Sequence, residues 1–395
     1  MKQKIQELAQ GLYEDVVAYR RYLHTHPELS FQEHNTSRFI KSTLDSLGIA
    51  WDTMANTGVV GIIRGEKPSE AVLALRADID ALPIQEANAV AYRSRQEGVM
   101  HACGHDAHTA SLLGAAAILH QLRSEFGGVV KLVFQPAEEK VPGGALQMMK
   151  EGVLEQPRPQ AVLGQHVMPS IRAGQVGVRS GRFMASNDEV YITVRGRGGH
   201  GAQPQLNTDP VVIAAHILLA LQQIVSREAD PKTPTVLSFG KVVANGAVNV
   251  IPDEATLEGT FRTTDELWRG VAHRRIREVA SGIAACMGAS CDVTIVQGYP
   301  CLINEDRLTA MFKSWAEEYL GEENVLEADV WMASEDFAYY AQAADACFYL
   351  LGVGAAAQGQ NASLHTPTFD IDEQALETGA GLMAFAALRC LGMGA

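Results

Sequence analysis

The chain has 395 residues, of which 47% are hydrophobic and 20% are charged. This composition is typical of a folded protein with two or three domains and excludes a disordered chain. The 32 Lys and Arg stand against 46 Asp and Glu, and this net charge of −14 disfavours nucleic-acid or anionic-membrane partners. The N-terminal residues lack the apolar core of a signal peptide and the six cysteines form no CxxC pair, so we expect a cytoplasmic protein.

The first part of the sequence alternates between predicted helices and strands. Apolar residues recur with helical spacing over residues 7–23, 35–47 and 109–122. Short runs rich in β-branched residues, bounded by Gly, Pro or charged residues, are predicted strands at 57–63, 71–77, 129–134 and 161–167. This alternation predicts an α/β sheet whose ligand site lies at the carboxyl ends of its strands.

The pattern changes near residue 183. A strand at 189–194 alternates apolar and polar residues, as an edge strand does, and precedes an apolar helix at 210–226. The apolar stretch 211–225 within this helix is shorter than the roughly 20 residues that span a membrane, so we expect a buried helix and no membrane partner. The elements that follow are strands 235–243 and 255–262, a helix at 266–287 and a strand at 290–296. This β-α-β-β-α-β order is typical of a ferredoxin-like α+β unit.

Beyond residue 297 the α/β pattern resumes, with helices at 308–320 and 373–391 and a strand at 347–352. The sequence therefore predicts a domain of residues 183–297 inserted into a discontinuous α/β domain of residues 1–182 and 298–395.

Metal-ligating side chains are densest in residues 101–108, which read His-Ala-Cys-Gly-His-Asp-Ala-His. Three imidazoles, a thiol and a carboxyl group in eight positions suit a divalent transition metal better than an incidental polar loop. The spacing alone does not decide which of them bind. His101 and His105 share a face in a helix, whereas Cys103 and His105 share a side in an extended segment.

Three other segments place ligand-type residues at strand ends or in loops. Glu138 and Glu139 follow the predicted strand 129–134, His166 ends the strand 161–167, and His365 lies in a loop before the last helix. Considered alone, the Glu pair is also explained as a turn cap, His166 as a core histidine and His365 as a surface histidine. Their coincidence at one edge of a sheet favours a metal site.

Several ordered motifs resemble one family. They begin at Arg20 (RRYLHTHPEL), Arg76 (RADIDALPI), Gly198 (GGHGA) and Asn249 (NVIP), and they flank the His/Cys segment and the Glu pair. Over nearly its whole length the chain resembles metal-dependent amidohydrolases, which include hippurate hydrolases, indole-acetyl-amino-acid hydrolases and N-acyl-amino-acid deacylases. The resemblance implies a zinc-exopeptidase-like, three-layer catalytic domain with a mixed sheet, and an inserted α+β lid domain through which a homodimer or higher oligomer forms.

Position by position, the resemblance implies two divalent metal ions (zinc, manganese, nickel or cobalt) and Glu138 as general base. The implied ligands are Cys103, His105, Glu139, His166 and His365. Because five ligands cannot fill two separate coordination shells, the ions must share a ligand, either the thiolate of Cys103 or a group derived from water. The sequence leaves this choice open. The segment Lys140–Gly144 departs from many relatives and puts the substrate specificity in question rather than the chemistry.

Four more residues have expected roles around the metals. Asp78, after the strand 71–77, is expected to orient a metal-bound histidine, with a turn before Pro83 as the alternative. The resemblance implies that His200, in a Gly-rich turn, donates a hydrogen bond in the transition state, often across a dimer interface. Asn249 and Arg262 are expected to bind a polar group and the carboxylate of the substrate.

These expectations predict hydrolysis of the amide bond of N-acyl amino acids to a free amino acid and a carboxylic acid. A metal-dependent exopeptidase or dipeptidase acting on short peptides is the alternative with the same metals. A non-catalytic binder of amino-acid conjugates and a dinucleotide-binding oxidoreductase are alternatives from other classes. The last rests on the GxGxxG match at residues 196–201, which lacks the acidic residue about 20 positions later that the fingerprint requires.

Overall fold

The computed structural model describes residues 1–355 and 362–392, and these form two compact units. Unit 1 comprises Met1–Gly181, Ile303–Asp329 and Asp336–Ala395, and unit 2 comprises Arg182–Leu302 and Val330–Glu335. The expected boundaries lie within a few residues of these. The short segment Val330–Glu335 was expected in the other domain. It joins unit 2 because the N–H of Ala185 donates to the carbonyls of Trp331 and Ala333 at 3.2 and 3.0 Å.

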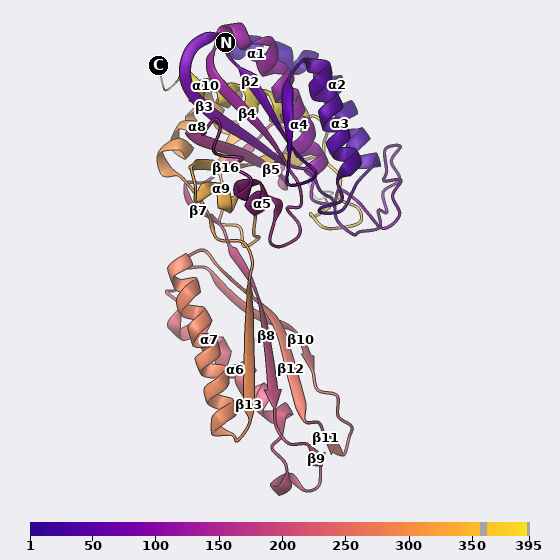
Figure 1. The fold of residues 1–395 in the computed structure, drawn as a ribbon, viewed down its shortest axis with the longest axis vertical. Helices are drawn as coiled ribbons and strands as arrows, with labels where there is room; N and C mark the ends of the chain where they lie inside the picture. Colours follow the sequence, from indigo (N-terminus) through magenta and orange to yellow (C-terminus); the bar gives the residue numbers. More distant parts are fainter. Residues whose placement is uncertain (356–361, 393–395) are drawn as a thin grey trace. The chain divides into compact units, whose positions relative to one another are not determined.

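Unit 1 contains an eight-stranded mixed sheet in the order β1-β2-β4-β3-β5-β16-β6-β15 (Figure 1). Its strands are β1 (Ala50–Met54), β2 (Gly58–Arg64), β3 (Lys67–Asp78), β4 (Gly127–Gln135), β5 (Ala161–Arg172), β6 (Val176–Val178), β15 (Val325–Glu327) and β16 (Asp345–Gly354). The four central strands β4, β3, β5 and β16 run parallel, so their carboxyl ends share one edge of the sheet. Their near-continuous apolar runs are typical of strands that are buried on both faces.

Helices cover both faces of this sheet. The helices are α1 (Lys2–Gly11), α2 (Tyr13–Thr25), α3 (His34–Leu47), α4 (His105–Gln121), α5 (Gly144–Lys150), α8 (Asp306–Leu320), α9 (Ala338–Ala341) and α10 (Ala375–Leu391). On β4, Val130, Leu132 and Phe134 join a core with α1–α4, α8 and α10. Because side chains alternate along a strand, Lys131 and Val133 face the other side, where α5 packs on β4. The result is a three-layer arrangement, as expected.

Two predicted helices of unit 1 differ from those observed. The helix expected at 7–23 is two helices that meet at Leu12. The helix expected at 109–122 begins four residues earlier, at His105, and is buried along nearly its whole length. The His/Cys segment therefore enters a core helix, and this fixes the backbone of its second half.

Unit 2 contains a four-stranded antiparallel sheet in the order β10-β12-β8-β13. Its strands are β8 (Ser186–Arg195), β10 (Thr235–Val243), β12 (Glu254–Thr263) and β13 (Ser290–Gln297), and β9 (Gly199–His200) pairs with β11 (Val250–Ile251) in a separate ribbon. Helices α6 (Pro210–Gln223) and α7 (Glu266–Cys286) pack with the sheet around one apolar core. The chain passes between the units at β7 (Gly181–Met184) and β14 (Leu302–Asn304).

The prediction that residues 189–194 form an edge strand is wrong. Strand β8 lies between β12 and β13, and the edges are β10 and β13. The alternation along β8 arises because one face of the sheet packs against helices and the other does not, a pattern that central and edge strands share. Strand β8 therefore offers no free edge for pairing with a second copy of the chain.

Among the described residues, one helical segment, Pro210–Glu228, is long and apolar enough to cross a membrane by length and composition. Such a signal is weak, because the core helices of globular proteins satisfy the same criteria. Ile213, Ile217 and Leu221 of this segment pack into the core of unit 2, whereas Val212 and Leu219 are exposed, so the helix that we expected to be buried is buried on one face only.

Candidate metal centre

The candidate site lies in unit 1, at the carboxyl ends of β4, β3 and β5. Glu138 and Glu139 follow the end of β4, and His166 lies on β5 just beyond the stretch that pairs with β3. Cys103 and His105 stand at the start of α4, where Gly104 adopts a φ of +85° that favours glycine. His365 lies in the loop before α10, with a φ of +60°. Parallel strand ends and one helix start therefore bring distant segments to one place.

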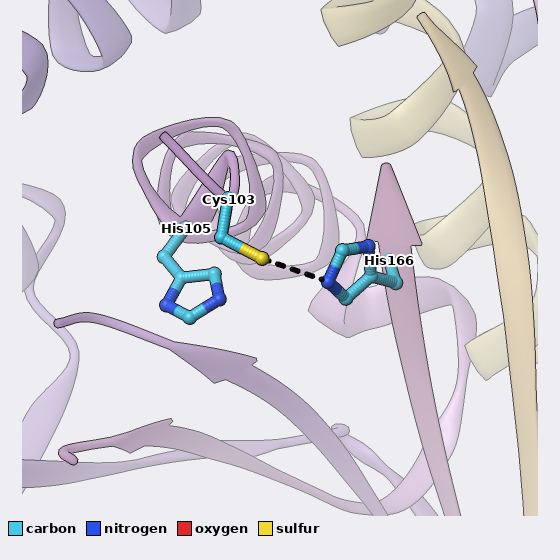
Figure 2. A group of neighbouring side chains, drawn as sticks. All are labelled: Cys103, His105 and His166. Carbon is cyan, nitrogen blue, oxygen red and sulfur yellow. Dashed lines mark hydrogen bonds between the residues drawn. The ribbon is translucent and has the colours of Figure 1, made fainter. Parts of the chain in front are cut away.

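The five side chains expected as ligands lie together. The Sγ of Cys103 is 3.4 Å from Nε2 of His166 (Figure 2) and 3.2 Å from Nε2 of His365. The Oε1 of Glu139 is 3.3 Å from Nε2 of His365 and 3.9 Å from Nε2 of His105. The donor atoms form overlapping groups within 4.8 Å: Cys103 with His105 and His166, Cys103 with Glu139 and His365, and His105 with Glu138 and Glu139.

These residues fit a divalent cation. Two buried donor atoms, Nε2 of His105 and Oε1 of Glu139, make no hydrogen bond to any described residue. A buried polar atom without a partner costs free energy, and a cation held by both atoms removes that cost. Thiolate, imidazole and carboxylate donors together suit zinc and its transition-metal neighbours.

The pKa shifts of the site residues apply to the protein without a bound cation. Burial raises the pKa of the Cys103 thiol well above its ordinary value, and the carboxylates of Glu139 and Glu138 add to this. Burial lowers the pKa of His105, but Asp78 and Asp80 outweigh it and raise this pKa to about 10. A proton on His105 thus balances the surrounding carboxylates. Cation binding must displace such protons, since only deprotonated thiols and imidazoles ligate metals.

Asp80 organises the site. Its Oδ1 lies 3.2 Å from Nδ1 of His105, and the carboxylate accepts the backbone N–H groups of Glu138 and Glu139 at 3.1 and 3.0 Å. The hydroxyl of Ser30 donates to Oδ2 at 2.7 Å. This side chain therefore orients one expected ligand and fixes the backbone of another and of the expected base.

Asp78, which we expected to orient a metal-bound histidine, has different principal partners. It accepts hydrogen bonds from Nδ1 of His108 at 2.5 Å and from Arg76 at 2.9 Å, and it lies 3.4 Å from Nε2 of His105. His108 in turn accepts the N–H of Val167 at 2.8 Å, next to His166. Asp78 therefore helps to hold β5, the strand that carries His166, through the imidazole of His108, which is not one of the expected ligands.

Glu33 is a site residue that no pattern in the sequence predicts. Its buried carboxylate accepts the N–H of Ala137 at 2.8 Å and the hydroxyl of Thr57 at 2.7 Å. Ala137 has a φ of +52°, a conformation that is rare for residues other than glycine, and it directly precedes Glu138. Burial raises the pKa of Glu33 to about 7, with Asp80 contributing. Glu33 thus holds a strained backbone position beside the expected base.

The segment that departs from relatives is a turn between the Glu pair and α5. The N–H of Gly143 donates to the carbonyl of Lys140 at 2.9 Å, and Lys140 itself is exposed. A Cβ on Gly144 would lie 1.8 Å from the carbonyl oxygen of Pro136, so only glycine fits there. The turn places an exposed lysine directly after Glu139.

The remaining expected residues lie in unit 2. His200 and Asn249 are neighbours in the β9–β11 ribbon, where the N–H of Gly201 donates to the carbonyl of Asn249 at 2.9 Å. Arg262 lies at the opposite end of the sheet, since on β12 it pairs with Asn187 near the start of β8. Its guanidinium donates to the carbonyl of Met332 at 3.0 Å, and burial lowers its pKa. Within unit 2 the structure brings His200 and Asn249 together and leaves Arg262 apart from them.

Comparison with known proteins identifies relatives over most of the chain. An N-acyl-L-amino acid amidohydrolase of Geobacillus stearothermophilus is 43% identical over 306 residues, which are 77% of this chain and 82% of the relative. An N-acetyl-L-cysteine deacetylase of Bacillus subtilis is 38% identical over 366 residues, 92% of this chain and 85% of the relative. The crystal structure of the Bacillus subtilis YXEP protein, a dinuclear metal binding peptidase of the M20 family, matches with a TM-score of 0.84 and 35% identity, and covers 97% of this chain and 99% of that one.

The model of peptidase family M20/M25/M40 matches residues 74–389. This match and the relatives confirm the resemblance to metal-dependent amidohydrolases and the expected fold class. The chain therefore belongs to peptidase family M20/M25/M40.

Proposed function

We propose that this protein hydrolyses the amide bond of N-acyl amino acids and releases a free amino acid and a carboxylic acid. The observation that carries the proposal is the convergence of a thiol, three imidazoles and a carboxylate beside the buried Glu138. The relatives support the substrate class, since one is named an N-acyl-L-amino acid amidohydrolase and another an N-acetyl-L-cysteine deacetylase.

Two divalent cations would be held in this centre by Cys103, His105, Glu139, His166 and His365. Cys103, Glu139 and His105 each belong to more than one of the donor groups, so the groups that would hold the two cations share side chains. When bound, such ions polarise the amide carbonyl and lower the pKa of water. Zinc, manganese, nickel and cobalt all accept this donor set, and availability decides among them.

Glu138 is the proton carrier in this mechanism. Its backbone is held by Asp80 and it follows the strained Ala137, so its carboxylate has a fixed position beside His105 and Glu139. Glu138 takes a proton from the attacking water as the oxygen bonds to the carbonyl carbon. It then gives this proton to the amide nitrogen as the C–N bond breaks. The carboxylic acid and the amine are the only products.

We assign substrate contacts in unit 2 to His200, Asn249 and Arg262, and we place a homodimer interface on the same unit. Helix α6 contacts the edge strand β10 and presents an apolar stripe, on which Val212 and Leu219 are 47% and 68% exposed. Exposed apolar side chains beside an unpaired strand edge favour association of two copies. His200 would then donate its hydrogen bond in the site of the partner subunit.

A reducing compartment such as the cytoplasm fits the thiol chemistry of the proposed centre. All six cysteines lie in the described part of the chain and none of them forms a disulfide there. An oxidised Cys103 could not serve as a ligand, because only the thiolate binds metals.

The deciding experiment combines metal analysis with a substrate panel. The holoenzyme is incubated with acetyl-, benzoyl- and indoleacetyl-amino acids and with dipeptides, and the free amino acid released is measured. We expect two metal ions per chain and turnover of the acylated amino acids. Turnover of dipeptides alone would favour an exopeptidase. Tight binding of the conjugates without turnover by metal-loaded protein would favour a binding protein.

A further inference from the structure

A cavity of about 270 Å³ lies against Glu139 in unit 1. Its walls include the aliphatic side chains of Leu29, Ala81, Leu82 and Pro83, and Lys140 stands at its rim. The cavity therefore adjoins the candidate metal centre through one of the proposed ligands, and it offers mostly apolar surface to whatever enters it.

The walls of this cavity are held by the same backbone that builds the centre. Leu29 and Ala81 form a parallel bridge, and Leu82 exchanges two hydrogen bonds of 3.0 Å with Met100. The hydroxyl of Ser30, which also lines the cavity, donates to Asp80 at 2.7 Å. The cavity thus keeps a fixed position relative to the atoms that would bind the cations, as a specificity pocket must.

The chemistry of the walls selects an uncharged occupant. A substrate carboxylate placed among Leu29, Leu82 and Pro83 would lose its hydration, which is unfavourable. Lys140 also lines the cavity, but it is exposed and so supplies no buried positive charge to compensate. An aliphatic chain or an aromatic ring in the same place buries apolar surface. The amino-acid end of an N-acyl amino acid always carries a carboxylate, whereas its acyl end carries no charge, so the acyl end suits the cavity better.

We propose that this cavity binds the acyl group of the substrate and that Leu29 and Leu82 determine which acyl groups are accepted. The proposal rests on the proposed function, since it assigns a pocket to one part of the N-acyl amino acid. It places the acid side of the scissile bond toward Leu82 and leaves the amino-acid carboxylate outside the cavity.

Leu29 has a second role in this pocket. A neighbouring cavity of about 290 Å³ is also lined by Leu29 and Gln32. Leu29 and Gln32 therefore border both cavities, and we expect a shorter side chain at position 29 to leave more room for a long acyl group.

The test compares the holoenzyme with Leu82→Trp, Leu29→Ala and a control, Leu326→Trp. Leu326 is 37% exposed on β15, at the far edge of the sheet. One series keeps the amino acid constant and varies the acyl group from acetyl to butanoyl, hexanoyl and octanoyl, and a second series keeps acetyl and varies the amino acid. Metal content is measured for every variant, so that loss of the centre is recognised.

We expect Leu82→Trp to lower the kcat/KM ratio of hexanoyl to acetyl substrate by about tenfold or more, as methylene discrimination in apolar pockets allows. Leu29→Ala should raise the ratio of octanoyl to hexanoyl substrate, and Leu326→Trp should change neither ratio. Unchanged ratios in both pocket variants, or a shift in amino-acid preference instead, would overturn the proposal.

A binding measurement separates this proposal from the proposed function. Calorimetric titration of N-hexanoyl and N-acetyl amino acid into metal-loaded Glu138→Gln protein, with and without Leu82→Trp, reports on the pocket without turnover. Selective loss of hexanoyl binding in the double variant supports the pocket even if the wild type hydrolyses nothing in the panel. Equal binding in both backgrounds refutes the pocket even if the wild type is active.

Discussion

The Oδ1 atom of Asp80 lies 3.2 Å from Nδ1 of His105, and the same carboxylate accepts the N–H groups of Glu138 and Glu139. Because Nδ1 faces Asp80, Nε2 is the ring nitrogen that faces Glu139. One carboxylate thus sets the direction of an imidazole and the position of the two adjacent glutamates. This arrangement couples the geometry of the proposed metal ligands to that of the proposed base.

Replacing Asp80 should therefore weaken metal binding and catalysis together. We expect Asp80→Ala to lower metal affinity by about 10- to 100-fold, the usual effect of removing a partner of a ligating histidine. Asp80→Asn should be milder, because its one amide oxygen at the Oδ1 position still faces Nδ1 of His105 and accepts the N–H of Glu138, and only the acceptor for Glu139 is lost. Competition with a chelator measures the affinity, and Asp52→Ala, at an exposed position of β1, is the control. Wild-type affinity in Asp80→Ala would contradict the orienting role.

Glu138→Gln should separate catalysis from metal binding. The amide is nearly isosteric but cannot carry the proton, so we expect kcat to fall by about 10²- to 10⁴-fold while two metal ions remain bound. Glu139→Gln is the matched comparison, because loss of a ligand should lower the metal content. Metal analysis and steady-state kinetics on both variants check this. A Glu138→Gln enzyme with normal kcat would remove Glu138 from the mechanism.

Cys103 should give the metal centre a spectroscopic signature. Cobalt-loaded protein is expected to show a thiolate-to-metal charge-transfer absorption, since soft thiolates bind this ion. Cys103→Ser should lose that band and bind metal more weakly, whereas Cys347→Ser, a buried cysteine on β16, should keep it. Absorption titration with cobalt checks both outcomes. A band that persists in Cys103→Ser would assign the thiolate to another residue.

The apolar stripe on α6 predicts the effect of a charge at Leu219. Leu219→Asp should shift the protein from dimer to monomer, because an aspartate at the interface must lose its hydration. Leu267→Asp on α7, where the leucine is 86% exposed, should leave the dimer intact. Sedimentation velocity on both variants measures the oligomeric state. If His200 acts in trans, the Leu219→Asp monomer should also lose activity while it keeps its metals, and full activity in a monomer would refute that role.

Lys131 predicts a pH dependence of stability that is independent of the metal centre. Its buried Nζ donates to the carbonyl of Val153 at 2.7 Å, and burial lowers its pKa to about 8. In the unfolded chain the pKa of this lysine is about 10.4. Between about pH 8 and 10.4 the unfolded chain therefore binds more protons than the folded chain. The free energy of unfolding should therefore rise with pH between about 8 and 10.4, and the full cost of the charged lysine applies below pH 8.

Lys131→Met removes this titration. We expect the variant to gain on the order of 1–3 kcal/mol over the wild type at pH 7, with the difference shrinking toward pH 10. Urea unfolding of both proteins at pH 7, 9 and 10 checks this. A difference that stays constant with pH would show that Lys131 does not titrate in this window.

Much of the chemistry could be predicted from the residues themselves. Cys103 and His105 belong to a short segment rich in metal-ligating side chains, and the Glu pair directly follows a predicted strand. Parallel strands place their carboxyl ends at one edge of the sheet, whatever the details of packing. The role of His365 is harder to predict from the sequence, because this residue reaches Cys103 from a loop 262 residues away. Its assignment depended on resemblance rather than on any local pattern.

Other features could not be predicted because local patterns do not encode them. Asp78 and Asp80 are two residues apart at a strand end, and only the start of α4 at His105 decides which of them meets Nδ1. The alternation along β8 reports that one face is buried, but not whether the strand has one neighbour or two. Glu33 supports Ala137 across 104 residues, and nothing near it in sequence marks that role.

The donor types, the α/β class and the inserted unit follow from composition and periodicity, which are local properties of the chain. Three other features appear only in the folded protein: which carboxylate orients His105, which strands form the edges of unit 2, and the apolar cavity beside Glu139. Those outcomes depend on contacts between distant segments, whose geometry is set by the packing of the whole core.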